Sequence, residues 1–77
     1  MQQDNFEIAP SALRHGINEL EILHALRNPI RIAPISEELN MVIGDDGSRG
    51  LIEIGIDTRD ERIVVIHAMP ARAKFLR

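Results

Sequence analysis

The stretch Leu51–Ala68, LIEIGIDTRDERIVVIHA, decides the fold because it contains two strand-like runs joined by a short polar turn. In the first run, Leu51–Ile56, three isoleucines share one face at the two-residue period of a strand, and Glu53 lies on the other face. The second run, Ile63–Ala68, is rich in β-branched residues. The turn Asp57–Glu61 is too short for a crossover, so the two strands are expected to be antiparallel neighbours.

Two more strands are predicted on the N-terminal side of this pair. Asn40–Gly44 is a short strand, and the segment after it, Gly44–Gly50 with the sequence GDDGSRG, is the clearest turn in the chain. Ile30–Ile35 alternates as a strand does. Because Pro34 cannot donate a ladder hydrogen bond, the far end of this strand is expected at an edge or a bulge.

Before these strands, the sequence predicts a helix over Asn18–Arg27. Asn18 suits the N-cap, and Glu21 follows three residues later, as in a capping box. The pair Asn28–Pro29 ends the helix, because the residue before a proline disfavours the helical conformation. The helix has a broad apolar face made by Ile22, Leu23, Ala25 and Leu26.

Shorter elements are predicted toward the two ends of the chain. Phe6–Ala9 is expected to be an edge segment, followed by a short helix over Pro10–Leu13, and Pro70 is expected to open a short helix to the C-terminus. Residues 1–77 are therefore predicted to form one α+β domain, a small antiparallel sheet of three to four strands with helices packed on one face. The core is expected to include Leu23, Leu26, Ile54 and Val65.

The composition limits the classes of protein to which the chain can belong. Its 77 residues fit one small domain, and the absence of cysteine excludes disulfides and thiolate zinc sites. No segment approaches the ~20 apolar residues that cross a bilayer. The start MQQDNFE lacks the basic and apolar regions of a signal peptide. We therefore expect a cytoplasmic protein with no membrane partner.

Charge is unevenly distributed along the chain, although the net charge is only −3. Residues 36–61 carry eight acidic side chains against two arginines, whereas residues 62–77 carry four basic side chains and no acid. A basic terminal stretch on an acidic body points to an anionic partner. The alternative is that these charges belong to an ordinary solvated surface.

The side chains best suited to chemistry are histidines, since the chain has no Walker or dinucleotide loop, no HExxH motif and no nucleophile elbow. No metal and no cofactor are therefore expected. His24 is predicted at the helix surface. His15 follows Arg14 in a loop, where it can donate a proton or bond a backbone carbonyl. His67 ends a strand with two apolar faces, where it is either a buried neutral histidine or a general acid or base.

Arg72 favours the catalytic interpretation of His67. If Pro70 opens a helix, Arg72 faces the sheet, where a guanidinium requires an anion or an acid nearby, while Lys74 and Arg77 face outward. The N–H groups at the start of that helix also favour anions. His67, Arg72 and the helix start are therefore predicted to form a phosphate-binding site.

Four segments of the chain resemble the small BrnT-type toxins of bacterial toxin–antitoxin pairs, in a branch common in actinobacteria. They are FEIAPSALRHGI (6–17), the helix ending NPIRI (28–32), VIGDDGSRGLIEIGI (42–56) and IVVIHAMPARAKFL (63–76). Arg14–Gly16 stand where the family has Lys/Arg-His-Gly. His67–Met69 stand where typical members carry Ser-Ala-Arg, so the role of that arginine must pass from Met69 to Arg72 or be lost.

The resemblance implies the fold of RelE-like toxins, which are similar in layout to microbial ribonucleases. These toxins cut RNA without a metal. Such cleavage requires a base for the 2′-hydroxyl, cations for the phosphorane and an acid for the leaving oxygen. The catalytic residues implied are His67, His15 and Arg72. The residues implied in binding RNA phosphate are Arg14, Lys74 and Arg31.

The expected function is therefore that of a ribonuclease toxin that acts on RNA or ribosome-bound mRNA, inhibits translation and growth, and is neutralised by a cognate antitoxin. The alternative is a catalytically silent protein-binding module of the same fold, which acts through contacts with itself or with a partner chain. Since a 77-residue chain buries little apolar surface alone, we also expect a homodimer or an antitoxin complex.

Overall fold

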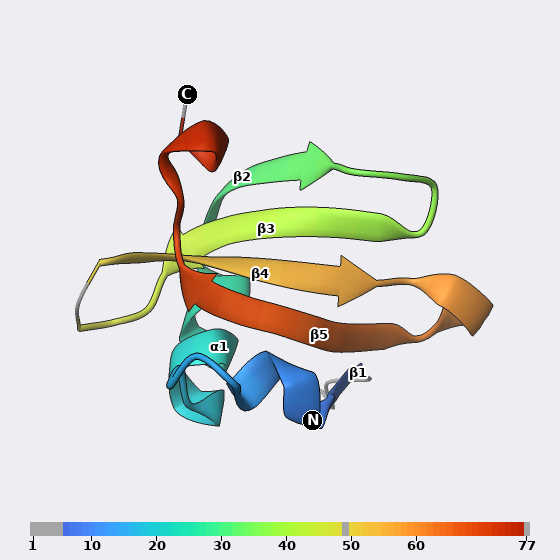
Figure 1. Ribbon diagram of the computed structural model, residues 1–77, viewed down its shortest axis with the longest axis horizontal. Coiled ribbons are helices and arrows are strands. Elements are labelled where there is room, and N and C mark those ends of the chain that lie inside the picture. Colours follow the sequence, from blue (N-terminus) through green and yellow to red (C-terminus); the bar gives the residue numbers. More distant parts are fainter. Residues whose placement is uncertain (1–5, 49, 77) are drawn as a thin grey trace.

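A hairpin of two long strands, β4 (Leu51–Asp57) and β5 (Ile63–Pro70), lies in the middle of the sheet in the computed structural model (Figure 1). The structure describes residues 6–48 and 50–76. In these residues, five strands form one sheet in the order β1-β5-β4-β3-β2, accompanied by one α-helix and three 3-10 turns. The other elements are β1 (Phe6–Ile8), η1 (Pro10–Leu13), α1 (Glu19–Arg27), β2 (Pro29–Pro34), β3 (Leu39–Asp45), η2 (Arg59–Glu61) and η3 (Ala73–Phe75).

The structure confirms the α+β class and the antiparallel pairing of β4 with β5, but the sheet is larger than predicted. β1 pairs with β5 in parallel, with Phe6 opposite Ile63 and Ile8 opposite Val65. The sheet is therefore mixed and has five strands among the described residues, rather than three or four antiparallel ones. A parallel pair needs a crossover, and most of the chain lies between β1 and β5, so no local turn signal marks this contact.

The helix α1 begins as the sequence predicts. Asn18 is the N-cap: its Oδ1 accepts a hydrogen bond from the N–H of Glu21 (2.9 Å), while Oε1 of Glu21 accepts one from the N–H of Asn18 (3.0 Å). The helix approaches β3 at Gly44, where an added Cβ would lie 2.3 Å from the carbonyl oxygen of Ala25. Because no side chain fits in that space, the glycine permits the close contact between helix and sheet.

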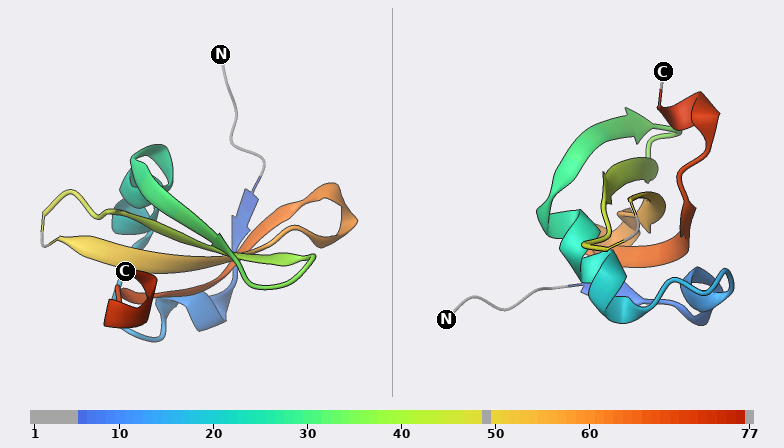
Figure 2. Two further views of the ribbon diagram at one scale, coloured as in Figure 1. Left: turned by 90° about the horizontal axis from the view of Figure 1, so that it is seen from above. Right: turned by 90° about the vertical axis from the view of Figure 1, so that its left-hand side faces the viewer.

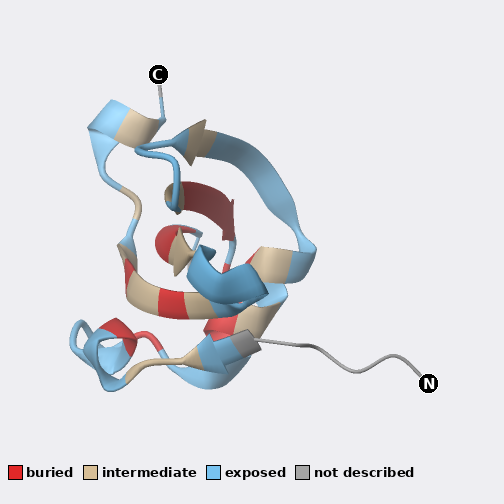
Figure 3. Cartoon of the chain, turned by 90° about the vertical axis from the view of Figure 1, so that its right-hand side faces the viewer, coloured by how far each residue is buried: buried red, intermediate tan, exposed pale blue. Residues whose placement is uncertain are grey.

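The core lies between the sheet and the layer formed by α1 and η1. Of the expected core residues, Ile54 and Val65 are fully buried, Leu26 is partly buried against the core, and Leu23 is partly exposed. Figure 3 shows that burial concentrates in the middle of the sheet, while the edge strand β2 is mostly exposed. Within the described residues, no helix has the length and apolar character that a membrane span requires. The buried members of this core are Ala12, Ile17, Ile22, Ala25, Val42, Ile52, Ile54, Val65 and Ala68.

A β-bulge in β5 changes which residues share a face. Gly55 pairs with His67 and Ile56 pairs with Val65, so Ile66 is an extra residue in the ladder. The carbonyl oxygen of Ile66 accepts a hydrogen bond from the Ser11 hydroxyl (2.7 Å). The two-residue period of a regular strand predicts that Val65 and His67 lie on one face. This prediction is wrong, because the bulge turns His67 away from the core that contains Val65.

The helix predicted from Pro70 to the C-terminus does not form. β5 continues through Pro70, which pairs with Ile52, and Arg72 has an extended backbone (φ −86°, ψ 151°) before the single turn η3. The N–H of Ala71 donates to the carbonyl of Leu51, and this bond keeps the chain extended. Figure 2 shows the sheet curving so that the C-terminal segment leads from the end of β5 toward β2.

Candidate active site

Glu53, in the middle of β4, is a charged residue with no exposed surface. Its cross-strand neighbours are Ile43 on β3 and Met69 on β5, both apolar. Paired residues share a face, and Glu53 follows Ile52 in the strand, so its side chain faces away from the core under α1. A carboxylate in such surroundings is stable only with hydrogen-bond donors close by.

Arg72 supplies most of those donors. Its backbone N–H lies 2.9 Å from Oε1 of Glu53, and its Nε lies 3.1 Å from Oε1 and 3.0 Å from Oε2. Its Nη2 lies 2.6 Å from Oε2, which completes a two-pronged contact between guanidinium and carboxylate. Nη1 has no partner among the described residues, and the Arg72 side chain is 43 % exposed. Its Cζ lies over the Phe75 ring, 5.4 Å from the centroid, so Glu53 and Phe75 together hold the guanidinium.

His67 is the second partner of the buried carboxylate. Its Nε2 lies 2.9 Å from Oε2 of Glu53, and its side chain is 27 % exposed. Gly55 lies directly across the ladder, where an added Cβ would lie 3.0 Å from the Cβ of His67. The glycine thus leaves room for the imidazole beside Glu53.

His15 reaches the same site from the loop after η1. The centroids of the His15 and His67 rings are 5.9 Å apart, and the ring planes meet at 71°. The Ser11 hydroxyl holds η1 to the bulge of β5 at Ile66, the residue directly before His67, and so fixes the approach of the loop. Of the three residues predicted to be catalytic, His67 and Arg72 both contact Glu53, and His15 lies beside His67.

The predicted phosphate-binding residues are less concentrated. Arg14 is exposed at the end of η1, next to His15. The Nζ of Lys74 lies 5.1 Å from the centroid of the Phe75 ring, and Nη1 of Arg31 donates to the carbonyl of Phe75 (3.2 Å). Lys74 therefore lies in the turn η3, and Arg31, on β2, directs its side chain to that turn. Arg77, predicted to face outward, lies outside the described residues.

Glu53 is the site residue that sequence reasoning missed. The alternation of LIEIGI places it on the face opposite the isoleucines, which is correct, but that face is buried here as well. The signal in the sequence that points to Glu53 is Arg72, because its guanidinium requires an anion or an acid nearby. The structure provides that acid within the chain, whereas the helix N-terminus expected at Ala71 and Arg72 is absent, and their N–H groups bond Leu51 and Glu53 instead.

The charges at the site favour an ionised pair. Burial raises the pKa of Glu53, but hydrogen bonds from the side chain and backbone of Arg72 and from His67 together bring this pKa below its ordinary value. The hydrogen bond to Glu53 in turn raises the pKa of Arg72, against the smaller opposing effect of burial. Glu53 is therefore a carboxylate at neutral pH, and it can orient the imidazole of His67 as in a carboxylate–histidine pair.

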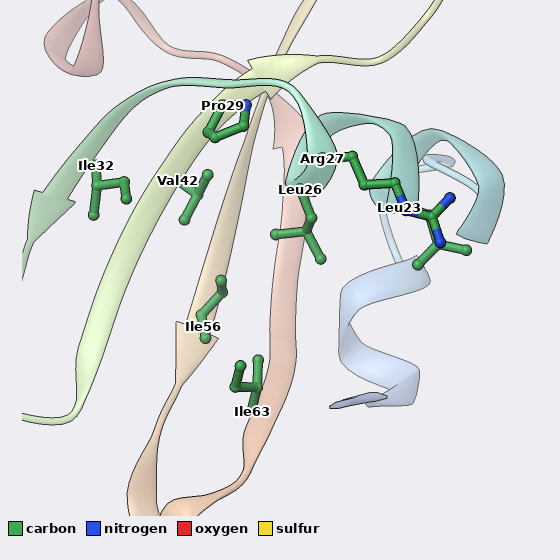
Figure 4. A pocket seen from close by; sticks show the side chains of 8 residues that line it. All are labelled: Leu23, Leu26, Arg27, Pro29, Ile32, Val42, Ile56 and Ile63. Atoms are coloured by element: carbon green, nitrogen blue, oxygen red, sulfur yellow. The ribbon is translucent and has the colours of Figure 1, made fainter. Parts of the chain in front are cut away.

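An apolar pocket lies on the opposite face of the sheet, between α1 and the strands (Figure 4). Its volume is about 330 Å³. Val42 and Ile56 belong to the face that carries the core, so the pocket does not open toward Glu53 and His67. The side chains that line it are Leu23, Leu26, Arg27, Pro29, Ile32, Val42, Ile56 and Ile63.

Two further findings bear on the identity of the site. In the described part of the chain, no group of three or more His, Cys, Asp or Glu side chains is placed to hold a metal ion. Comparison of the chain with family models, with curated proteins and with solved structures returned no match. The class of the protein therefore rests on the geometry of the site.

Proposed function

We propose that this chain is a BrnT-like toxin with the RelE-like fold, a ribonuclease of a bacterial toxin–antitoxin pair that cuts RNA without a metal in the cytoplasm. The observation that carries the proposal is the pair of imidazoles, His15 and His67, with ring centroids 5.9 Å apart. One of them is anchored to a buried carboxylate, and a partly exposed arginine lies beside it. Two imidazoles at this spacing can act on opposite sides of a phosphodiester.

The reaction that this arrangement supports is transfer of the phosphoryl group to the neighbouring 2′-oxygen of the RNA. One imidazole takes the proton of the 2′-hydroxyl while the bond between O2′ and phosphorus forms. The bond between phosphorus and O5′ then breaks, and the other imidazole gives its proton to the leaving O5′. The products are a 2′,3′-cyclic phosphate and a 5′-hydroxyl. Two arginines supply positive charge for the phosphorane: Arg72, whose Nη1 has no partner among the described residues, and Arg14, which directly precedes His15.

The position of Arg72 supports a transfer of the family arginine's role. Met69, which stands where related toxins carry that arginine, is the cross-strand partner of Glu53. Arg72, three residues later, brings its guanidinium to the same Glu53. A positive charge is thus kept beside this carboxylate although Met69 carries none.

The test is RNA cleavage by the purified chain in the presence of a chelator. We expect cleavage by the parent chain, and His67→Ala and His15→Ala should each lower the rate by about 10²–10⁴-fold, the usual contribution of a general acid or base. His24→Ala is the matched control, because His24 is exposed and its Nδ1 donates to the carbonyl of Asp45 (2.7 Å), away from the site. Cleavage that survives both site substitutions, with folding intact, would reject the proposal.

The second candidate is the catalytically silent binding module, acting through contacts with itself or with a partner chain. The observation that favours it is the apolar pocket beside the edge strand β2. Two isoleucines of this strand are largely exposed, Ile30 with 62 % and Ile32 with 61 % of its surface accessible. Sedimentation of the purified chain at micromolar concentration addresses this candidate. A chain that leaves RNA intact, does not slow growth when induced alone and sediments as a dimer would favour the module over the ribonuclease.

A further inference from the structure

We infer that Glu53 is a positioning residue: it holds neutral His67 as the Nε2–H tautomer, so that Nδ1 is the nitrogen that takes the substrate proton. The tautomer depends only on the geometry around Glu53, whereas the transfer of the substrate proton rests on the proposed ribonuclease function. If the tautomer and the ribonuclease function are both as proposed, His67 is the general base and His15 is the general acid.

The tautomer follows from the hydrogen bonds around the carboxylate. An ionised carboxylate only accepts hydrogen bonds, and Arg72 already contacts both oxygens of Glu53 with its N–H, Nε and Nη2. The atom 2.9 Å from Oε2, Nε2 of His67, must therefore be a donor. A neutral imidazole carries one N–H, so the lone pair must be on Nδ1.

The surroundings of Nδ1 leave it available. Among the described residues, none offers Nδ1 of His67 a hydrogen-bond partner, although the side chain is only 27 % exposed. Gly55, opposite His67 in the ladder, has no side chain that could cover the ring. Glu53 itself does not reach the substrate side, because it has no exposed surface. It can therefore act on the reaction only through His67 and Arg72.

The first measurement is the tautomer of His67 in the full-length ¹⁵N-labelled chain, read from long-range ¹H–¹⁵N correlations of the imidazole. The spectrum is recorded at a pH at which the imidazole of His67 is neutral, and we expect a protonated Nε2 and an unprotonated Nδ1. A protonated Nδ1 would overturn the inference without touching the proposed ribonuclease function. This spectrum uses the parent chain, so it stands even if a variant fails to fold.

The second measurement compares Glu53→Gln with Glu7→Gln. The amide introduced by Glu53→Gln can either accept from or donate to Nε2, so we expect both tautomers of His67 to appear and kcat for RNA cleavage to fall at least tenfold with little change in KM. Glu7 forms an exposed ion pair with Arg62 on the edge strand β1, and its replacement should change neither reading. A single unchanged tautomer and an unchanged kcat in Glu53→Gln would refute the positioning role.

These two readings separate the possible failures. If the parent chain has the expected tautomer, Glu53→Gln alters it and no RNA is cleaved, Glu53 positions His67 and the ribonuclease function is wrong. If RNA is cleaved and the tautomer is the opposite one, the function stands and the role of Glu53 is wrong.

Discussion

Glu53 is a buried carboxylate on β4 whose hydrogen-bond partners come from β5 and from the segment that follows it. Alternation with isoleucines predicts the direction of its side chain, because the two-residue period is a local property of a strand. Its burial depends on His67 and Arg72, which lie 14 and 19 residues further along the chain. The sequence therefore predicts His67, His15 and Arg72 as site residues from their own chemistry, but not the carboxylate that joins two of them.

Glu61 is a second residue whose state is not visible in the sequence. Asp60 and Glu61 are the only described non-glycine residues with positive φ, at 61° and 60°, and the N–H of Arg62 donates to the carbonyl of Arg59 across them (3.3 Å). Glu61→Gly should remove the steric cost of this conformation, about 1–2 kcal/mol, against about 0.5–1 kcal/mol of added chain entropy. We expect the free energy of unfolding in urea to rise by about 0.5–1 kcal/mol.

Glu37→Gly is the control for this substitution. Glu37 is an exposed acid between β2 and β3 and is not among the residues with positive φ. We expect this variant to be no more stable than the parent chain. Equal stabilisation by both substitutions would mean that loss of a surface carboxylate, rather than relief at φ > 0, is the cause.

At the scale of elements, α1 and the C-terminal segment show why one helix is predictable and the other is not. The start of α1 is set by two residues in the same turn, Asn18 and Glu21, so the signal and the structure coincide. Pro70 also suits a helix start, but Leu51 and Glu53 on β4 bind the next two N–H groups. The extended chain satisfies those groups, so the strand continues and the helix is lost.

The capping box of α1 gives a prediction for this element. Asn18→Ala removes the acceptor for the N–H of Glu21 and should lower the free energy of unfolding by about 1 kcal/mol. Asn18→Ser is the matched control, since serine accepts the same hydrogen bond, and we expect it to remain within about 0.5 kcal/mol of the parent. Urea unfolding measures both. If serine costs as much as alanine, the side chain of Asn18 stabilises the chain by some contact other than the cap.

At the scale of the whole molecule, the α+β class and the three antiparallel pairings follow from short links that the sequence displays. The parallel contact of β1 with β5 joins residues near the two ends of the chain, so no local pattern could reveal it. The curvature that brings the C-terminal turn toward β2 is of the same kind, because Arg31 reaches the carbonyl of Phe75 across 44 residues.

The buried pair of Glu53 and Arg72 predicts how the stability of the molecule depends on pH. The pKa of Glu53 is lowered in the folded chain, so its contribution is complete above its ordinary value near 4.5 and is lost as pH falls through the lowered value. At about pH 7, Glu53→Gln should lower the free energy of unfolding. The loss should be smaller than the about 3–5 kcal/mol that breaking a fully buried ion pair costs, because Arg72 keeps contact with water. This difference from the parent should shrink progressively below about pH 4.5.

Urea unfolding of both chains, from about pH 7 down to about pH 3, measures this dependence. Hydrogen bonds from the backbone and side chain of Arg59 also lower the pKa of Asp57, but Asp57 is present in both chains and its effect cancels in the difference. Glu7→Gln should differ little from the parent at every pH, because it removes an exposed carboxylate. If Glu53→Gln and the parent chain differ in free energy of unfolding by the same amount at both ends of the pH range, the pKa of Glu53 is not lowered in the folded chain.

The bulge at Ile66 has a consequence for how chains of this kind should be aligned. Val65 and His67 occupy successive rungs of the ladder opposite Ile56 and Gly55, so a chain without residue 66 would place the same side chains on the same faces. A gap of one position there would keep the His67 side chain facing Glu53, at the loss of the carbonyl that the Ser11 hydroxyl binds, whereas a gap between His67 and Arg72 would move the imidazole or the guanidinium away from Glu53.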